Sequence, residues 1–183
     1  MKKLLLVLLA LGALSACSRS EAPTAQQEPS VDQHQVLTNM VEQYWQDSLE
    51  LNPLMAAFVG DNRYNDRWVG GISPKERADR QAHHQRYLDA AKAIDASTLD
   101  AEDRLTLELF TAEREMDLEG FRYPSHLLPI NQFRNPASYF VLLGSGSSVH
   151  PFKTVKDYDD FLSRADDYSV IIDQIITNMK LGM

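Results

Sequence analysis

The sequence predicts an all-α protein, an irregular array of several helices without a significant sheet. Apolar residues recur every three or four positions in several long stretches, which is the spacing of helices that bury one side. Residues typical of helix starts precede these stretches, and glycine follows some of them. Hydrophobic residues make up 44% of the chain, which is enough for a core, and the single cysteine allows no internal disulfide.

Residues 1–17 have the layout of a bacterial lipoprotein signal peptide. Lys2 and Lys3 precede the apolar run Leu4–Leu14, which is too short for a comfortable membrane span. The end of this run, Leu14-Ser15-Ala16-Cys17, resembles a lipobox, in which the cysteine becomes the lipidated first residue of the mature protein. Ordinary signal cleavage would instead place Leu14 where a small residue is wanted. We therefore expect a membrane anchor through lipidated Cys17.

The residues after Cys17 indicate how the anchored protein is placed. By resemblance to Gram-negative sorting signals, Ser18 favours the periplasmic face of the outer membrane in the cell envelope. Residues 18–30 are polar, small and proline-bearing, which predicts a flexible tether. The formal charge of −8 becomes more negative once the two signal lysines are removed, and this argues against a nucleic-acid partner.

The predicted helical domain comprises residues 31–183. Within it, the segment Asn52–Trp68, NPLMAAFVGDNRYNDRW, combines a helix start, an apolar turn, a glycine stop and a dense set of charged residues. Asn52 can cap a short helix, Pro53 suits its first position, and Gly60 can end it. The loop that follows carries the side chains singled out as a candidate site: Asp61, Arg63, Tyr64 and Asp66. We interpret the loop first as a structural corner of charge pairs and buried rings, and alternatively as part of a channel wall.

Other start and stop signals predict further helices. They place helices at about 31–51, 73–94, 100–120 and 138–143 and from 154 onward, and an irregular segment from 121 to 133 with two prolines. Periodicity assigns the buried side of each. The expected stripes are Ala78, Ala82, Leu88 and Ala91 in residues 73–94; Leu105, Leu109, Ala112 and Met116, broadened by Leu107, Phe110 and Leu118, in residues 100–120; and Val155, Tyr158, Leu162, Ala165, Ser169, Ile172, Ile176 and Met179 in the last helix.

The histidines do not form a recognisable metal motif. A helical zinc pair needs histidines four residues apart, whereas the side chains of His83 and His84 point about 100° apart. We expect both to lie at the surface or at the boundary of the core. No histidine in the sequence is followed by Glu-x-x-His, and the run Gly144–Ser148 lacks the Gly-Lys-Ser/Thr of a phosphate loop.

Four segments in register resemble one bacterial family. "GDNRYNDRW", "DAEDRLTLELF", "HLLPINQF" and "HPFKTVKDYDDFLSR" are similar to the amino-terminal part of the domain of unknown function 885 family, over about Leu37 to Met183. The resemblance implies a mostly helical envelope lipoprotein, related to gluzincin-type zinc metallopeptidases. In that class a His-Glu-x-x-His helix binds zinc and its glutamate activates water. No catalytic or metal residue carries over to this chain, so zinc is expected only in a full-length family member.

Two functional hypotheses follow. In the first, the chain is an amino-terminal fragment of a peptidase-like lipoprotein and is not catalytic by itself, because its apolar faces pack against a missing carboxy-terminal region. In the second, it is a complete, non-catalytic helical lipoprotein that binds a peptide or a protein partner. We expect no cofactor in this chain under either hypothesis.

Overall fold

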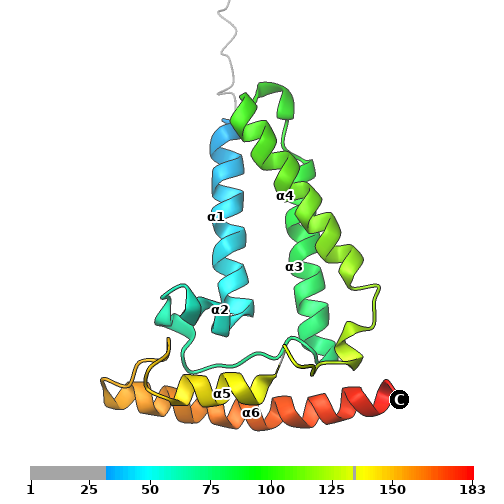
Figure 1. The fold of residues 1–183 in the computed structure, drawn as a ribbon. Helices are drawn as coiled ribbons and strands as arrows, with labels where there is room; N and C mark the ends of the chain where they lie inside the picture. Colours follow the sequence, from blue (N-terminus) through cyan, green and yellow to red (C-terminus); the bar gives the residue numbers. More distant parts are fainter. Residues whose placement is uncertain (1–31, 134) are drawn as a thin grey trace, which may run out of the picture. The chain divides into compact units, whose positions relative to one another are not determined.

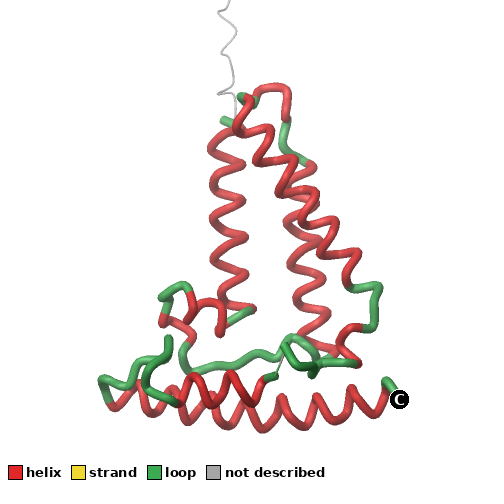
Figure 2. Tube along the Cα trace, viewed as in Figure 1, coloured by secondary structure: helices red, strands yellow, loops and turns green. Residues whose placement is uncertain are grey.

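The computed structural model describes residues 32–133 and 135–183, and every regular element in these ranges is a helix (Figures 1 and 2). This confirms the prediction of an all-α array. The α-helices are α1 (Gln33–Leu51), α2 (Pro53–Phe58), α3 (Pro74–Lys92), α4 (Ala101–Gly120), α5 (Pro136–Gly144) and α6 (Val155–Leu181), with 3-10 turns η1 (Asn62–Tyr64), η2 (Ala96–Thr98) and η3 (Ser125–Leu127). The predicted signal peptide, lipidation at Cys17 and the tether of residues 18–30 lie outside the described residues.

Side-chain caps fix where most of these helices begin. The side chain of Asn52 accepts a hydrogen bond from the Met55 amide at the start of α2. At the start of α4, the side chain of Asp100 accepts one from the Asp103 amide. Ser73 opens α3 and Thr154 opens α6, each through a reciprocal capping box. These starts follow the sequence prediction. In α1 the cap is Asp32, and the helix begins at Gln33.

The first apolar core lies between α1, α3 and α4. Leu37 and Met40 from α1 meet Tyr87 and Ala91 from α3, and Phe110 closes the cluster from α4. Tyr44 contributes a ring at the edge of this core and lies edge-on to Phe110, with centroids 5.1 Å apart. Burial of these aromatic and aliphatic groups holds α1, α3 and α4 together.

A second apolar core lies against α6. It is built from Trp68, Leu143, Ile171 and Ile175, and Phe140 stacks on the ring of Trp68 at 6.1 Å. Figure 1 shows α5 running alongside α6. Trp68, from the loop that follows η1, packs with Leu143 of α5 and Ile171 of α6. The chain between α2 and α3 therefore contributes Trp68 and Ile72 to this second core.

The prediction for the buried side of α4 was correct for Leu107 and Phe110, which were expected to broaden the stripe, and wrong for the stripe itself. Leu105, Leu109 and Met116 are 55%, 57% and 74% exposed, and Ala112 is exposed with them. The buried side instead carries Leu107, Phe110 and Arg114. Arg114 belongs there because its guanidinium carbon lies 4.2 Å from the centroid of the Tyr44 ring, where a cation is attracted to the aromatic face.

The buried sides of α6 and α3 also differ from the prediction. Val155, Tyr158, Leu162, Ile176 and Met179 are exposed, whereas the buried side of α6 carries Asp160, Arg164, Ile171, Ile175 and Asn178. In α3 the predicted Leu88 and Ala91 are buried, but Ala78 and Ala82 are exposed, and His83 and Tyr87 are buried in their place. In each helix, polar or aromatic residues displaced the apolar stripe that periodicity had favoured. No described helix has the length and apolar character needed to cross a membrane.

Candidate functional site

The predicted loop begins with a short turn that Asp61 holds in place. Its carboxylate accepts hydrogen bonds from the amide of Arg63 at 3.0 Å and from the guanidinium of Arg63 at 2.6 Å. Arg63 also donates to the side chain of Gln46 on α1 at 2.5 Å. The guanidinium lowers the pKa of the Asp61 carboxyl, so this carboxylate stays ionised and bound within the chain.

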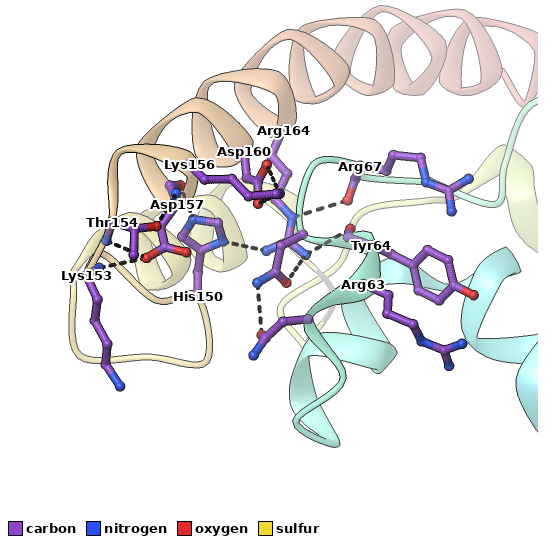
Figure 3. Close-up of polar contacts among 12 residues, drawn as sticks. Arg63, Tyr64, Arg67, His150, Lys153, Thr154, Lys156, Asp157, Asp160 and Arg164 are labelled. Atoms are coloured by element: carbon purple, nitrogen blue, oxygen red, sulfur yellow. Dashed lines mark hydrogen bonds and ion pairs between the residues drawn. The ribbon is translucent and has the colours of Figure 1, made fainter.

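Tyr64 lies beside two arginines, and Asp66 is exposed. The guanidinium carbons of Arg63 and Arg67 lie 5.2 and 4.8 Å from the centroid of the Tyr64 ring, within the range of cation–π attraction. Figure 3 shows the side chains of Arg63, Tyr64 and Arg67 on the same side of this loop. The charge of Asp66 contributes to raising the pKa of Lys156 on α6, behind the larger effect of Asp160. The four predicted side chains thus share one loop but do not converge on one point.

The centre of this region is Arg164, which the sequence analysis did not single out. Its side chain is 0% exposed and binds the loop from α6 (Figure 3). It donates to the backbone oxygen of Arg67 at 3.2 Å and to the side-chain oxygen of Asn65 at 3.0 Å. Burial lowers the pKa of Arg164 to about 10, so the group remains a cation at neutral pH.

His150 completes the set of partners around Arg164. It is 1% exposed, and its Nδ1 accepts a hydrogen bond of 2.9 Å from the Arg164 guanidinium. Its Nε2 donates to the backbone oxygen of Asp157 at 2.8 Å. An imidazole that accepts at one nitrogen and donates at the other is neutral, and burial correspondingly lowers the pKa of His150.

Trp68 ends the loop and links it to α6 by a different contact. Its amide donates to the carboxylate of Asp167 at 2.8 Å, while its ring enters the second core. The loop therefore contacts α6 through Asn65, Arg67 and Trp68, and contacts α1 through Arg63. With most of its polar groups bonded inside the chain, this arrangement positions α1 and α6 relative to the loop.

The expectation that His83 lies at the surface or boundary was wrong. His83 is buried and stacks on Tyr44 with ring centroids 4.8 Å apart. Its Nε2 lies 2.9 Å from the hydroxyl of Ser48, whose own proton goes to the Tyr44 carbonyl. Desolvation lowers the pKa of His83 to about 4. His84 is half-buried, with its Nδ1 3.3 Å from Asp117.

The described residues do not provide a zinc site. No group of three or more histidine, cysteine, aspartate or glutamate side chains among residues 32–133 and 135–183 is arranged to hold a metal ion. Among the other histidines, His34 binds Asp103 at 2.7 Å near the start of α1. The backbone oxygen of His126 accepts a hydrogen bond of 3.1 Å from the side chain of Asn178 on α6. The side chains present here therefore do not fit the ligand set of a gluzincin.

A cavity of about 430 Å³ lies between α3, the end of α4 and the α5–α6 pair. Its apolar lining includes Trp68, Tyr139, Ile171 and Ile175, and its polar lining includes Arg77, Arg80, Asp117 and His126. Small-molecule sites usually combine apolar walls with a few convergent polar groups, and this cavity has both. This cavity was not predicted from the sequence, in which its one local signal is the pair of arginines, Arg77 and Arg80, one turn apart after Gly70-Gly71.

A second cavity, of about 790 Å³, lies between α1 and α3 and is more highly charged. Apart from Arg80, which lines both cavities, its cations are already paired, since Arg67 lies 3.9 Å from Glu50 and Lys75 lies 2.6 Å from Asp79. Arg86 forms an ion pair with Asp47 in the same cavity. Because three of its four cations are matched within the chain, we regard the smaller cavity as the better candidate for a ligand.

The fold and these cavities define an all-helical protein with a ligand-sized cavity and no described metal centre. Residues 53–183 match the model of a family described as bacterial protein of unknown function, DUF885, and the chain belongs to that family. This confirms the resemblance found in the sequence. No curated protein and no solved structure matches the chain.

Proposed function

We propose that this chain is the non-catalytic, amino-terminal helical part of an envelope lipoprotein whose remaining polypeptide resembles a zinc metallopeptidase. The observation that carries the proposal is the pair of regular apolar stripes left exposed on α4 and α6. Single exposed apolar residues are ordinary on a protein surface, but a stripe that keeps helical spacing over several turns is typical of a packed helix face.

The exposed stripe on α4 is regular and apolar. Leu105, Leu109, Ala112 and Met116 follow one another at intervals of three or four residues, and all of them are exposed. The opposite side of α4 already packs on α1 and α3 through Leu107 and Phe110. A helix with apolar residues on both sides is typical of the interior of a larger fold, which supports a further block of polypeptide over this stripe.

Cysteine labelling in the cell envelope tests this coverage, because the only native cysteine is the proposed lipidation site. We would introduce Leu109→Cys in the stripe and, as the control, Glu108→Cys at the exposed position before it. The proposal predicts that the cysteine at 109 reacts slowly with a maleimide in native envelopes and quickly in the purified 183-residue chain. Equal reactivity of position 109 in both preparations would contradict it, provided that position 108 reacts in both.

The anchor is tested separately by cell fractionation. Cys17→Ala is expected to move the protein from the membrane fraction to the soluble periplasmic fraction, because lipidation requires the thiol. Ser18→Asp is expected to keep the protein in the membrane fraction but to shift it to the inner membrane, since Ser18 resembles an outer-membrane sorting signal. An unchanged location of the Cys17→Ala variant would refute the lipoprotein assignment.

The second candidate is a complete, non-catalytic ligand-binding lipoprotein. The cavity beside α3 favours it, because a ligand site of this size does not need further polypeptide to be formed. The two candidates differ in what covers the exposed stripes, so the labelling experiment at position 109 also discriminates between them.

A further inference from the structure

The cavity of about 430 Å³ contains two cations that lack carboxylate partners. Arg77 and Arg80 lie one turn apart on α3 and therefore face the same way. Arg77 donates to the backbone oxygen of Phe121, and Arg80 donates to that of Leu51, each at 3.3 Å. In the part of the chain that the structure describes, neither guanidinium lies within 4.0 Å of a carboxylate oxygen. Each guanidinium has five N–H donors, so several remain available.

The position of Arg80 makes this lack of a partner costly. Burial is the main influence on its guanidinium and lowers its pKa. The Gly71 backbone lies directly against the guanidinium, and a β-carbon at Gly71 would come within 2.6 Å of it. The charge of Glu76 offsets only part of this effect, because the pKa of Arg80 is still lowered on balance. A partly desolvated cation without a direct ion pair is unfavourable, and a bound anion would relieve that cost.

His126 adds a hydrogen-bonding atom to the same cavity. Its Nδ1 is buried and has no hydrogen-bond partner among the described residues. Burial and the neighbouring Arg77 cation both lower the pKa of His126, so the imidazole is neutral and can donate one proton to an acceptor. Its backbone is fixed, because Asn178 on α6 donates to the carbonyl oxygens of both His126 and Ile72.

The other residues that line the cavity determine the charge of the ligand and the character of the group that carries the anion. Trp68, Ile171 and Ile175 are buried apolar residues that form one wall. Asp117 also lines the cavity, and its carboxylate is bound to Arg114 at 2.9 Å. This acid disfavours a doubly charged ligand such as phosphate, whereas one planar carboxylate suits the guanidinium fork.

We propose that this cavity binds a small molecule in which one carboxylate is attached to an apolar or aromatic body. Arg77 and Arg80 bind the carboxylate, His126 donates a further hydrogen bond, and the body lies against Trp68. The site is held in shape by Glu76, whose carboxylate accepts from the amides of Gly70 and Ile72. This inference holds whether or not the exposed stripes of α4 and α6 are covered.

Fluorescence of Trp68 provides the measurement, because the chain has only one other tryptophan, Trp45. In the full chain carrying Trp45→Phe, we would titrate N-acetylphenylalanine, octanoate, N-acetylphenylalanine amide and inorganic phosphate. The proposal predicts saturable binding of at least one of the two carboxylates and binding of the amide weaker by about 10- to 100-fold, the usual worth of a charged hydrogen bond. The preferred carboxylate distinguishes an aromatic peptide end from an acyl chain.

Substitutions then test whether the arginines of α3 bind the carboxylate. Arg77→Gln is expected to weaken carboxylate binding by about tenfold or more, while the control Arg122→Gln, outside the cavity, leaves binding unchanged. Equal binding of acid and amide, equally tight binding of phosphate, or no saturable binding of either carboxylate would overturn the proposal. The comparison of acid with amide needs no substitution at α3, so it decides the question even if Arg77→Gln fails to fold.

Discussion

Arg164 donates a hydrogen bond of 2.9 Å to the Nδ1 of His150, and both side chains are almost completely removed from solvent. The two residues fix the protonation of each other, because the arginine is always a donor and the imidazole must then accept. The same guanidinium binds the loop oxygens of Tyr64 and Arg67. One buried cation therefore joins α6, the segment before it, and the loop that leads to α3.

Arg164→Met is expected to destabilise the chain by about 3 kcal/mol or more. The substitution leaves several buried acceptors without a donor, and each such acceptor costs about 1–3 kcal/mol. Chemical denaturation of the full chain at pH 7, followed by circular dichroism, measures the change.

The comparison variant is Arg63→Ala, in the same loop. Arg63 is largely exposed, and its partners can be solvated, so its loss should lower stability only slightly. Equal effects of the two substitutions would show that Arg164 is not the centre of the joint. A loss of turnover in a full-length relative carrying Arg63→Ala, with stability intact, would contradict the structural role of the loop.

Acid should destabilise the fold through His83. Its pKa is about 4 in the folded chain and about 6.5 when unfolded, so the unfolded state binds the proton more readily. The contribution of His83 is complete above pH 6.5 and is lost as the pH falls towards 4, and it amounts to about 3 kcal/mol. His83→Phe should therefore reduce the loss of stability between pH 7 and pH 4.

His34 is the control for this experiment because its shift has the opposite sign. Its hydrogen bond to Asp103 raises the pKa, so its contribution is present at low pH and is lost as the pH rises through the raised value. His34→Gln should slightly increase the loss of stability on acidification. A His83→Phe variant with an unchanged pH profile would mean that His83 titrates normally in the folded chain.

Gly71→Ala should destabilise the chain more than Gly60→Ala does. Both glycines have positive φ, of 71° and 87°, and an alanine there costs about 1 kcal/mol. Only at Gly71 does the new β-carbon also meet another group, the guanidinium of Arg80. The difference between the two midpoints of denaturation isolates that contact, and equal midpoints would argue against the close approach of Arg80.

Leu107→Ala and Leu109→Ala test the buried side of α4. Leu107 lies in the first core, so its truncation should cost about 2–4 kcal/mol. Leu109 is exposed in this chain, so its truncation should change stability by less than about 0.5 kcal/mol. A larger loss of stability for Leu109→Ala than for Leu107→Ala would mean that the stripe containing Leu109 is the buried side of α4.

The starts of the helices could be predicted from the sequence because the residues that cap them are close together in the chain. Ser73 with Glu76, and Thr154 with Asp157, each form a capping box within four residues. The buried sides could not be predicted in the same way, since α4 and α6 each have two sides with helical spacing. The side that packs carries Arg114 in α4 and Arg164 in α6, and only a distant aromatic ring or backbone oxygen makes a buried arginine favourable.

The candidate sites were predictable to different degrees for the same reason. Charge and aromatic density marked the loop from Asp61 to Trp68, but its main partner, Arg164, lies about a hundred residues further along. The cavity was not predicted, because its arginines, His126 and the apolar wall of α6 come from separate parts of the chain. Sequence spacing within one helix indicates only that Arg77 and Arg80 share a side.

The central claim is that this helical array is the non-catalytic part of a larger envelope protein, and the mass of the native protein tests it most directly. An antibody raised against the helical region would identify the protein in an envelope fraction. The account predicts a species clearly larger than the 20.7 kDa of this chain. A native species no larger than this chain would contradict it.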